Sequence, residues 1–208
     1  MRKTIFFDVD TQRDFMDPLG ALYVPGAEKI VHNLEDLTLY ARQHGIPIYG
    51  SVDRHLEDDP ELKRSGGPFP DHCMSGTEGQ KKIEETAPIN PIYVENREYS
   101  DDENDKIKGC SGEIIFEKQS FNPFDNPNAA RMVENVERAV VYGVATDYCV
   151  KATALALRDL GIEVLLVTDA IASVDVNPGD GERALNQLME KGVKTVTTDD
   201  IISDKLKL

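Results

Sequence analysis

Hydrophobic and polar residues alternate along the chain in two recurring patterns. Short apolar runs bounded by turn residues predict buried strands, whereas apolar residues three or four positions apart predict helices between them. The predicted strands are Thr4–Phe7, Ile46–Val52, Pro91–Glu95, Glu113–Glu117, Val141–Val144, Ile162–Thr168 and Lys194–Thr197. The predicted helices run from about Ala27 to Gly45, over Ala129–Val136, from just after Asp147 to Gly161 and over Gly181–Glu190, with a short helix at the carboxyl end.

This alternation of strands and helices predicts an α/β fold. It indicates a doubly wound, mostly parallel sheet with helices on both faces. The chain shows no repeat, linker or change in composition, so we expect a single domain over residues 1–208. Two segments are predicted to be irregular. Asp53–Gln80 is rich in glycine, proline and charge, and the acidic segment Tyr99–Gly112 is predicted to be a solvated loop whose role is left open.

Composition narrows the class of protein. A net charge of −15 and an isoelectric point near 4.6 argue against nucleic acid and anionic membranes as partners. The apolar run near the amino terminus is interrupted by Asp8, so it does not resemble a signal peptide, and no stretch is apolar enough to cross a bilayer. Three cysteines cannot form a complete disulfide framework. We therefore expect a cytoplasmic protein with reduced cysteines.

Three chemically distinct side chains follow predicted strands. Cys149 lies at a strand-to-helix turn, where a helix amino end favours a thiolate and lowers the pKa of a thiol. Asp10 and Lys118 each follow another strand, and the carboxyl ends of parallel strands meet at one edge of a sheet. A thiol, a carboxylate to carry its proton and a cation suit nucleophilic catalysis. The alternatives are a buried structural Cys149, a turn residue Asp10 and a solvated Lys118.

The segments around these residues resemble a known family. Asp10–Phe15 (DTQRDF), Lys118 and Gly143–Val150 (GVATDYCV) are similar to the isochorismatase-like cysteine hydrolases. The resemblance implies a doubly wound α/β fold, a catalytic triad of Cys149, Asp10 and Lys118, and a cis peptide between Val144 and Ala145. It also implies an oxyanion site formed by the backbone N–H groups of Ala145 and Cys149.

A second set of residues resembles the nicotinamidase branch of that family. Asp53 and His55 follow the second strand, and His72 comes later in the same polar segment. In that branch an Asp-x-His pair and a later histidine hold a metal, and Glu61 lies where a fourth ligand often stands. These ligand types suit one divalent transition metal, with zinc expected first and iron or manganese as alternatives. The resemblance also implies that Phe15 and Phe69 bracket a flat substrate ring.

The sequence thus predicts a metal-containing cysteine amidohydrolase. The favoured substrate is nicotinamide, which would give nicotinate and ammonia in NAD salvage. The first alternative is a related cysteine hydrolase of another small amide or ureido compound. An alternative from another class is a catalytically silent metal-binding scaffold. We expect a small-molecule amide as the partner and a homo-oligomer as the assembly.

Overall fold

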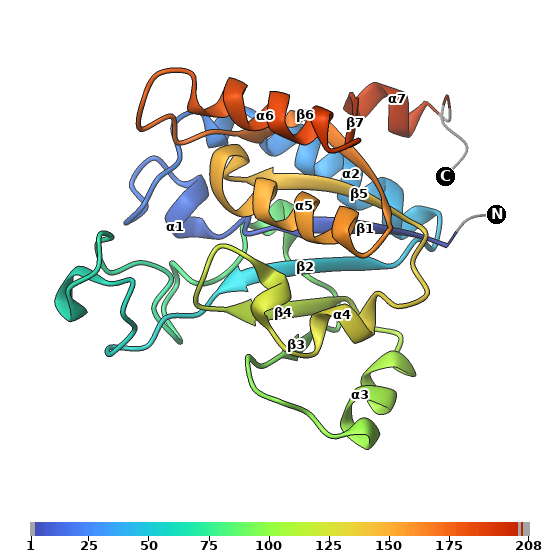
Figure 1. The fold of residues 1–208 in the computed structure, drawn as a ribbon, viewed down its shortest axis with the longest axis horizontal. Helices are drawn as coiled ribbons and strands as arrows, with labels where there is room; N and C mark the ends of the chain where they lie inside the picture. The colour runs from blue at the N-terminus through green and yellow to red at the C-terminus, as the bar shows by residue number, and fades with distance from the viewer. Residues whose placement is uncertain (1–2, 204, 206–208) are drawn as a thin grey trace.

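A seven-stranded sheet forms the centre of the protein in the computed structural model, which describes residues 3–203 and 205. The strand order is β3-β4-β2-β1-β5-β6-β7, and every paired neighbour is parallel (Figure 1). The strands are β1 (Thr4–Val9), β2 (Ile48–Asp53), β3 (Ile92–Val94), β4 (Ile114–Lys118), β5 (Arg138–Val144), β6 (Glu163–Ala172) and β7 (Lys194–Val196). The parallel α/β fold predicted from the sequence is confirmed.

Helices cover the sheet on both faces. The α-helices are α1 (Arg13–Met16), α2 (Val31–Gln43), α3 (Asp101–Lys108), α4 (Ala129–Met132), α5 (Lys151–Asp159), α6 (Asp180–Glu190) and α7 (Thr198–Ile202). Short 3-10 helices are η1 (Ala27–Lys29), η2 (Lys63–Ser65), η3 (Glu84–Thr86) and η4 (Pro123–Asp125), and η5 (Thr146–Val150) is a π-helical turn.

Two hydrophobic cores separate at β1 because successive strand side chains point to opposite faces. Phe7 packs into the core that includes Leu157 of α5 and Leu188 of α6. Phe6 packs into the other core, with Leu34 of α2. Figure 1 shows α5 and α2 on opposite sides of the strands. The alternation explains why β1 reads as a continuous apolar run: it is buried on both faces.

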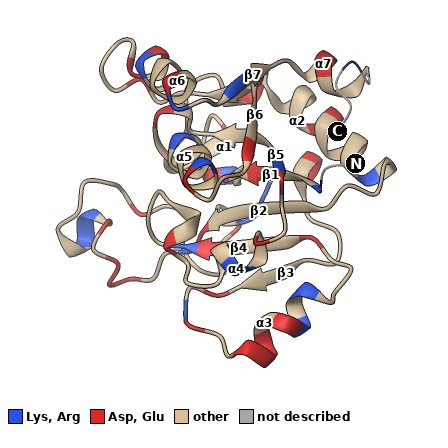
Figure 2. Ribbon diagram, turned by 45° about the vertical axis from the view of Figure 1, so that its right-hand side comes forward, with Lys and Arg blue, Asp and Glu red and all other residues tan. Residues whose placement is uncertain are grey.

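The prediction that the acidic segment Tyr99–Gly112 is a solvated loop is wrong for most of its length. Asp101–Lys108 is a helix, α3, rather than a solvated loop. Ser100 and Glu103 form a reciprocal capping box, in which the Ser100 hydroxyl accepts from the Glu103 N–H and the Glu103 carboxylate accepts from the Ser100 N–H. In Figure 2 the ribbon of this helix is red (Asp and Glu) at its start and blue (Lys) towards its end, which matches the direction of the helix dipole.

Other boundaries also differ from the sequence prediction. The helix predicted over Ala129–Val136 ends at Met132, and β6 continues to Ala172 rather than stopping at Thr168. The stretch that carries Cys149 is a π-helical turn before α5, not the first turn of an α-helix. The described residues include no helix long and apolar enough to cross a membrane.

The carboxyl end of β5 is shaped by a close backbone approach. Gly143 has φ +117°, and a Cβ at this position would lie 2.0 Å from the carbonyl oxygen of Val9. Only glycine fits there. The cis peptide expected between Val144 and Ala145 is present directly after it. β1 and β5 therefore end side by side, and the chain leaves β5 in the turn that carries Cys149.

Candidate active site

Asp10, Lys118 and Cys149 meet at the carboxyl edge of the sheet. Asp10 directly follows β1, Lys118 is the last residue of β4, and Cys149 lies in the turn after β5. Lys118 Nζ is 2.8 Å from a carboxylate oxygen of Asp10 and 3.6 Å from Cys149 Sγ. All three residues are buried. The strand ends thus place a thiol, a carboxylate and an ammonium within reach of one another, as the sequence pattern suggested.

Burial and the neighbouring charges shift the pKa values of Lys118 and Cys149. Burial lowers the pKa of Lys118, but the carboxylates of Asp10 and Asp53 outweigh it and hold that pKa well above its usual value. Burial also raises the pKa of the Cys149 thiol well above its usual value; Lys118 opposes this increase, and Asp10 and Asp53 add to it. The expectation that a helix amino end lowers the pKa of Cys149 is therefore wrong, because desolvation and two nearby carboxylates dominate.

The backbone at Asp10 is held in an unusual conformation. Its φ of +48° lies in the left-handed region, which is sparsely populated by residues other than glycine. Ser51 Oγ donates to the carboxylate at 2.7 Å. Gln12 side-chain atoms pair with both backbone groups of Asp53, at 2.6 Å to its N–H and 2.8 Å to its carbonyl oxygen. The turn after β1 is thereby tied to the end of β2.

A second group of side chains adjoins the first. Asp53, His55 and His72 each offer a ligand atom, and these atoms lie within 4.8 Å of one another. All three residues are buried, and Nε2 of His55 has no hydrogen-bond partner among the described residues. An imidazole nitrogen without a partner, facing a carboxylate and a second imidazole, fits a divalent transition metal.

Asp53 links the two groups directly. One of its carboxylate oxygens accepts from Lys118, and the other lies 3.8 Å from His55 Nε2 and 3.9 Å from His72 Nε2. Burial raises the pKa of Asp53, but Lys118 and His55 outweigh it and lower that pKa below its usual value. The predicted fourth ligand, Glu61, lies outside the three-residue set, with a carboxylate oxygen 3.5 Å from His55 Nε2.

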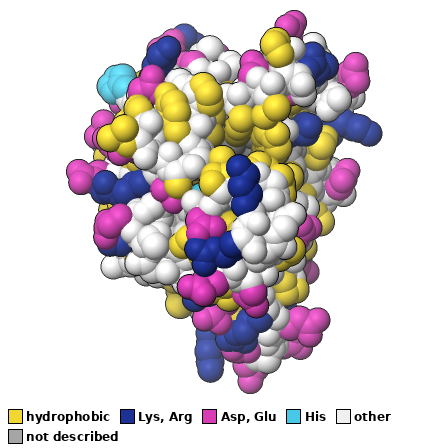
Figure 3. Space-filling view, turned by 90° about the vertical axis from the view of Figure 1, so that its left-hand side faces the viewer, with side chains coloured by type: hydrophobic (Ala, Val, Ile, Leu, Met, Phe, Trp, Pro, Cys, Tyr) yellow, Lys and Arg dark blue, Asp and Glu magenta, His cyan; other side chains and the backbone are white. Residues whose placement is uncertain are grey.

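A cavity of about 180 Å³ opens beside Cys149. Its walls contain the predicted residues Phe15, Phe69 and Ala145, together with residues of the metal group and apolar residues from several loops. The lining is Phe15, Leu22, Tyr23, Val24, Asp53, Glu61, Phe69, His72, Phe121, Val144, Ala145, Tyr148, Cys149, Val174 and Val176. Figure 3 views the molecule from the cavity side and shows hydrophobic side chains gathered in the upper half of this face.

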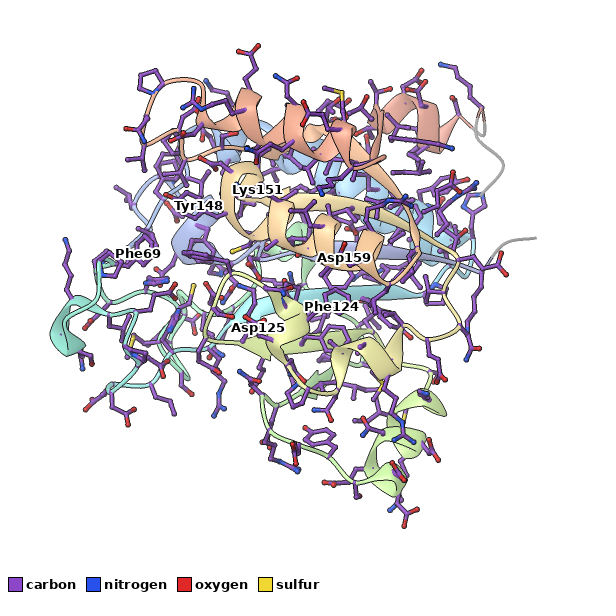
Figure 4. All side chains as sticks on the ribbon, in the orientation of Figure 1. Phe69, Phe124, Asp125, Tyr148, Lys151 and Asp159 are labelled. Carbon is purple, nitrogen blue, oxygen red and sulfur yellow. The ribbon has the colours of Figure 1, made fainter. Side chains whose placement is uncertain are left out.

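Three aromatic side chains form a chain of edge-to-face contacts beside the cavity. Phe121 meets Phe69 with ring centroids 6.0 Å apart and Tyr148 with centroids 5.1 Å apart. Figure 4 shows Phe69 and Tyr148 at the same end of the sheet. Phe15 lies elsewhere in the lining, with its ring 5.6 Å from that of His72. Phe15 and Phe69 were predicted from the sequence, whereas Phe121 and Tyr148 were not.

Comparison with known proteins identifies the family of this chain. The family model described as the isochorismatase domain matches residues 101–200. A nicotinamidase of Escherichia coli (strain K12) is 25% identical over 210 residues, which cover 92% of this chain and 93% of that protein. A nicotinamidase/pyrazinamidase of Mycobacterium tuberculosis is 27% identical over 176 residues, covering 81% and 86%.

A solved structure agrees with these relatives. The pyrazinamidase of Pyrococcus horikoshii, crystallised in complex with zinc, is 30% identical and superimposes with a TM-score of 0.75. The alignment covers 94% of this chain and 99% of that one. The chain therefore belongs to the isochorismatase-like family of cysteine hydrolases, and within it to the nicotinamidase branch.

Proposed function

We propose that this protein is a metal-containing amidohydrolase that converts nicotinamide and water into nicotinate and ammonia. The observation that carries the proposal is the position of the Cys149 thiol. It lies in the wall of a cavity that also contains Asp53, Glu61 and His72, and it contacts Lys118 at 3.6 Å. Relatives that cover most of the chain are nicotinamidases, which supports this choice of amide.

Cys149 is the proposed nucleophile. Because burial raises the pKa of its thiol, the resting group is the neutral thiol, and a base must accept the proton during attack. Asp10 is that base, and it later returns the proton to the departing ammonia. Lys118 positions the Asp10 carboxylate at 2.8 Å and stabilises the developing thiolate. Water then releases nicotinate from the thioester.

Backbone N–H groups are proposed to stabilise the tetrahedral intermediate. Ala145, which directly precedes the η5 turn, and Cys149, which lies within that turn, both line the cavity just after the cis peptide. Each donor of this kind is typically worth about 3–4 kcal/mol in the transition state.

Asp53, His55 and His72 are proposed to hold one divalent transition metal, with Glu61 as a candidate fourth ligand. Zinc is the first choice, because two imidazoles and a carboxylate are usual zinc ligands and a relative binds zinc. When bound, the metal supplies a Lewis acid that holds the ring nitrogen of the substrate. Phe15 and Phe69 are proposed to flank the ring.

The test is ammonia release from nicotinamide, with Cys149→Ala as the variant and Cys110→Ala, at an exposed cysteine, as the matched control. We expect activity in the wild type and the control, and none in Cys149→Ala at an unchanged melting temperature. Benzamide, which lacks the ring nitrogen, should be a much poorer substrate. Inactivity on nicotinamide with hydrolysis of another small amide or ureido compound would favour the alternative substrate. Zinc binding with no hydrolysis of any amide would favour a silent scaffold.

Two further properties are proposed. A cytoplasmic location is consistent with the free state of Cys73, Cys110 and Cys149. A homo-oligomer remains a prediction, which light scattering of the purified protein would test.

A further inference from the structure

The two histidines of the metal group have different hydrogen-bond partners at Nδ1. His72 Nδ1 lies 2.8 Å from the carbonyl oxygen of Pro70. His55 Nδ1 lies 3.0 Å from a carboxylate oxygen of Asp59. We infer that Asp59 is a positioning residue of the metal site, which fixes the tautomer and the ring orientation of His55. This inference rests on the proposed metal site.

The hydrogen bond determines which nitrogen of His55 faces the metal group. A carboxylate only accepts, so His55 Nδ1 must carry the proton and Nε2 keeps its lone pair. Nε2 is the atom that lies 3.8 Å from Asp53 and 3.5 Å from Glu61, and it has no hydrogen-bond partner among the described residues. A metal-binding histidine commonly has such a partner on its other nitrogen, which also increases the basicity of the ligand.

The backbone of His55 is anchored independently of Asp59. The His55 N–H donates to the Cys73 carbonyl oxygen at 3.1 Å, and the His55 carbonyl accepts from Ser75 at 2.9 Å. Loss of the Asp59 carboxylate would therefore leave the main chain of His55 in place. The imidazole ring would be free to rotate about its side-chain bonds, which is the effect expected of a positioning residue.

Asp59 also has a local structural role that the test must separate. The same carboxylate oxygen accepts from the Leu56 N–H at 2.8 Å, so Asp59 closes the turn that follows His55. Asp59→Asn keeps an oxygen for the Leu56 N–H and for His55 Nδ1 but removes the negative charge. Asp59→Ala removes both hydrogen bonds. Asp58→Ala is the matched control, because Asp58 is the adjacent residue and is exposed.

The experiment measures zinc affinity of the metal-free proteins by competition with a coloured chelator. We expect Asp59→Ala to bind zinc about 10–100-fold more weakly than wild type, Asp59→Asn to lie between them, and Asp58→Ala to match wild type. Cobalt substitution gives a second readout, since a rotated His55 changes the visible absorption bands. If Asp59→Ala melts far below wild type without metal, the comparison rests on Asp59→Asn, in which the turn is preserved.

Each result has a distinct meaning. Equal zinc affinities of the Asp59→Ala and Asp58→Ala proteins would overturn this inference while leaving the metal site intact. A wild-type protein that binds no zinc would overturn the metal site and this inference together. Neither result depends on ammonia release from nicotinamide, so hydrolysis is tested separately.

Discussion

Two lysines among the described residues are buried, and their surroundings differ. Lys118 contacts two carboxylates, those of Asp10 and Asp53, and lies near the Cys149 thiol. Lys82 contacts one carboxylate, Asp8, at 2.9 Å. Their side chains are 0% and 2% exposed, so burial does not distinguish them.

The difference lies in charge balance and in neighbours. Lys82 also donates to Thr11 Oγ1 at 3.2 Å, and the Thr11 hydroxyl pairs with both Asp8 and Thr86, so the Asp8 pair is neutral and closed by hydrogen bonds. At Lys118 one ammonium serves two carboxylates beside an ionisable thiol that faces a cavity. Two carboxylates and one ammonium leave an excess of negative charge, which suits the proposed role of Asp10 as the base that accepts a proton. We therefore propose that Lys118 takes part in catalysis and that Lys82 stabilises the fold.

The largest expected effect is on turnover. Lys118→Met should lower kcat for amide hydrolysis by about 10²–10⁴-fold, because the base loses the cation that positions it. Lys82→Met should keep kcat close to wild type when it is assayed well below its melting temperature. Steady-state kinetics of the two variants on nicotinamide make the comparison. Equal losses of kcat would show that the two lysines do not differ in role.

The second expected effect is on stability. Lys82→Met leaves the Asp8 carboxylate buried without its cation, which should lower the free energy of unfolding by about 3–5 kcal/mol. Urea titration measures it. The control is Lys81→Met, since the Lys81 side chain is 60% exposed and its loss should change stability by less than about 0.5 kcal/mol.

A double variant tests the cause of that loss. Asp8→Leu combined with Lys82→Met replaces both charges by apolar groups and should recover much of the stability, because the cost lies in the unpaired charge. If the double variant loses more unfolding free energy than the two single variants lose together, the unpaired charge is not the source of the lost stability.

The buried Asp8–Lys82 pair explains why the end of the first strand was not predicted correctly. The first strand was predicted to end at Phe7 because an aspartate interrupts an apolar run, yet β1 continues to Val9 with Asp8 buried. The residue that neutralises Asp8 is 74 positions away. Local patterns contain no information about such a partner, so the strand boundary was misplaced.

Other features were predictable to the extent that they were local. The strand ends that carry Asp10, Lys118 and Cys149 follow from apolar runs, and parallel topology brings them together. The capping signal Ser100–Glu103 was present in the sequence, but the charge of the segment favoured a loop, and the helix was missed. The raised pKa of Cys149 depends on burial and on Asp53, which come from the fold as a whole.

The smallest expected effect is on stability, at the less deeply buried carboxylate of Glu163. Glu163 contacts Lys194 at 2.6 Å and Arg138 at 2.9 Å, and the Lys194 side chain is 65% exposed. The hydrogen bond from Lys194 lowers the pKa of Glu163 most, burial opposes it, and Arg138 adds to the decrease, giving a pKa of about 2 against an ordinary value of 4.5.

The sign of the pH dependence follows from this decrease. A carboxylate with a lower pKa in the folded state stabilises the fold fully above its unfolded pKa, and the contribution is lost as pH falls from about 4.5 to about 2. Solvent screening limits the contribution to about 1 kcal/mol or less. Glu163→Gln should therefore be slightly less stable than wild type at pH 7, and the difference should shrink between pH 5 and about pH 3. Urea titrations at several pH values measure it. A difference in unfolding free energy that stays constant with pH would mean that Glu163 stabilises the fold by packing and not by its charge.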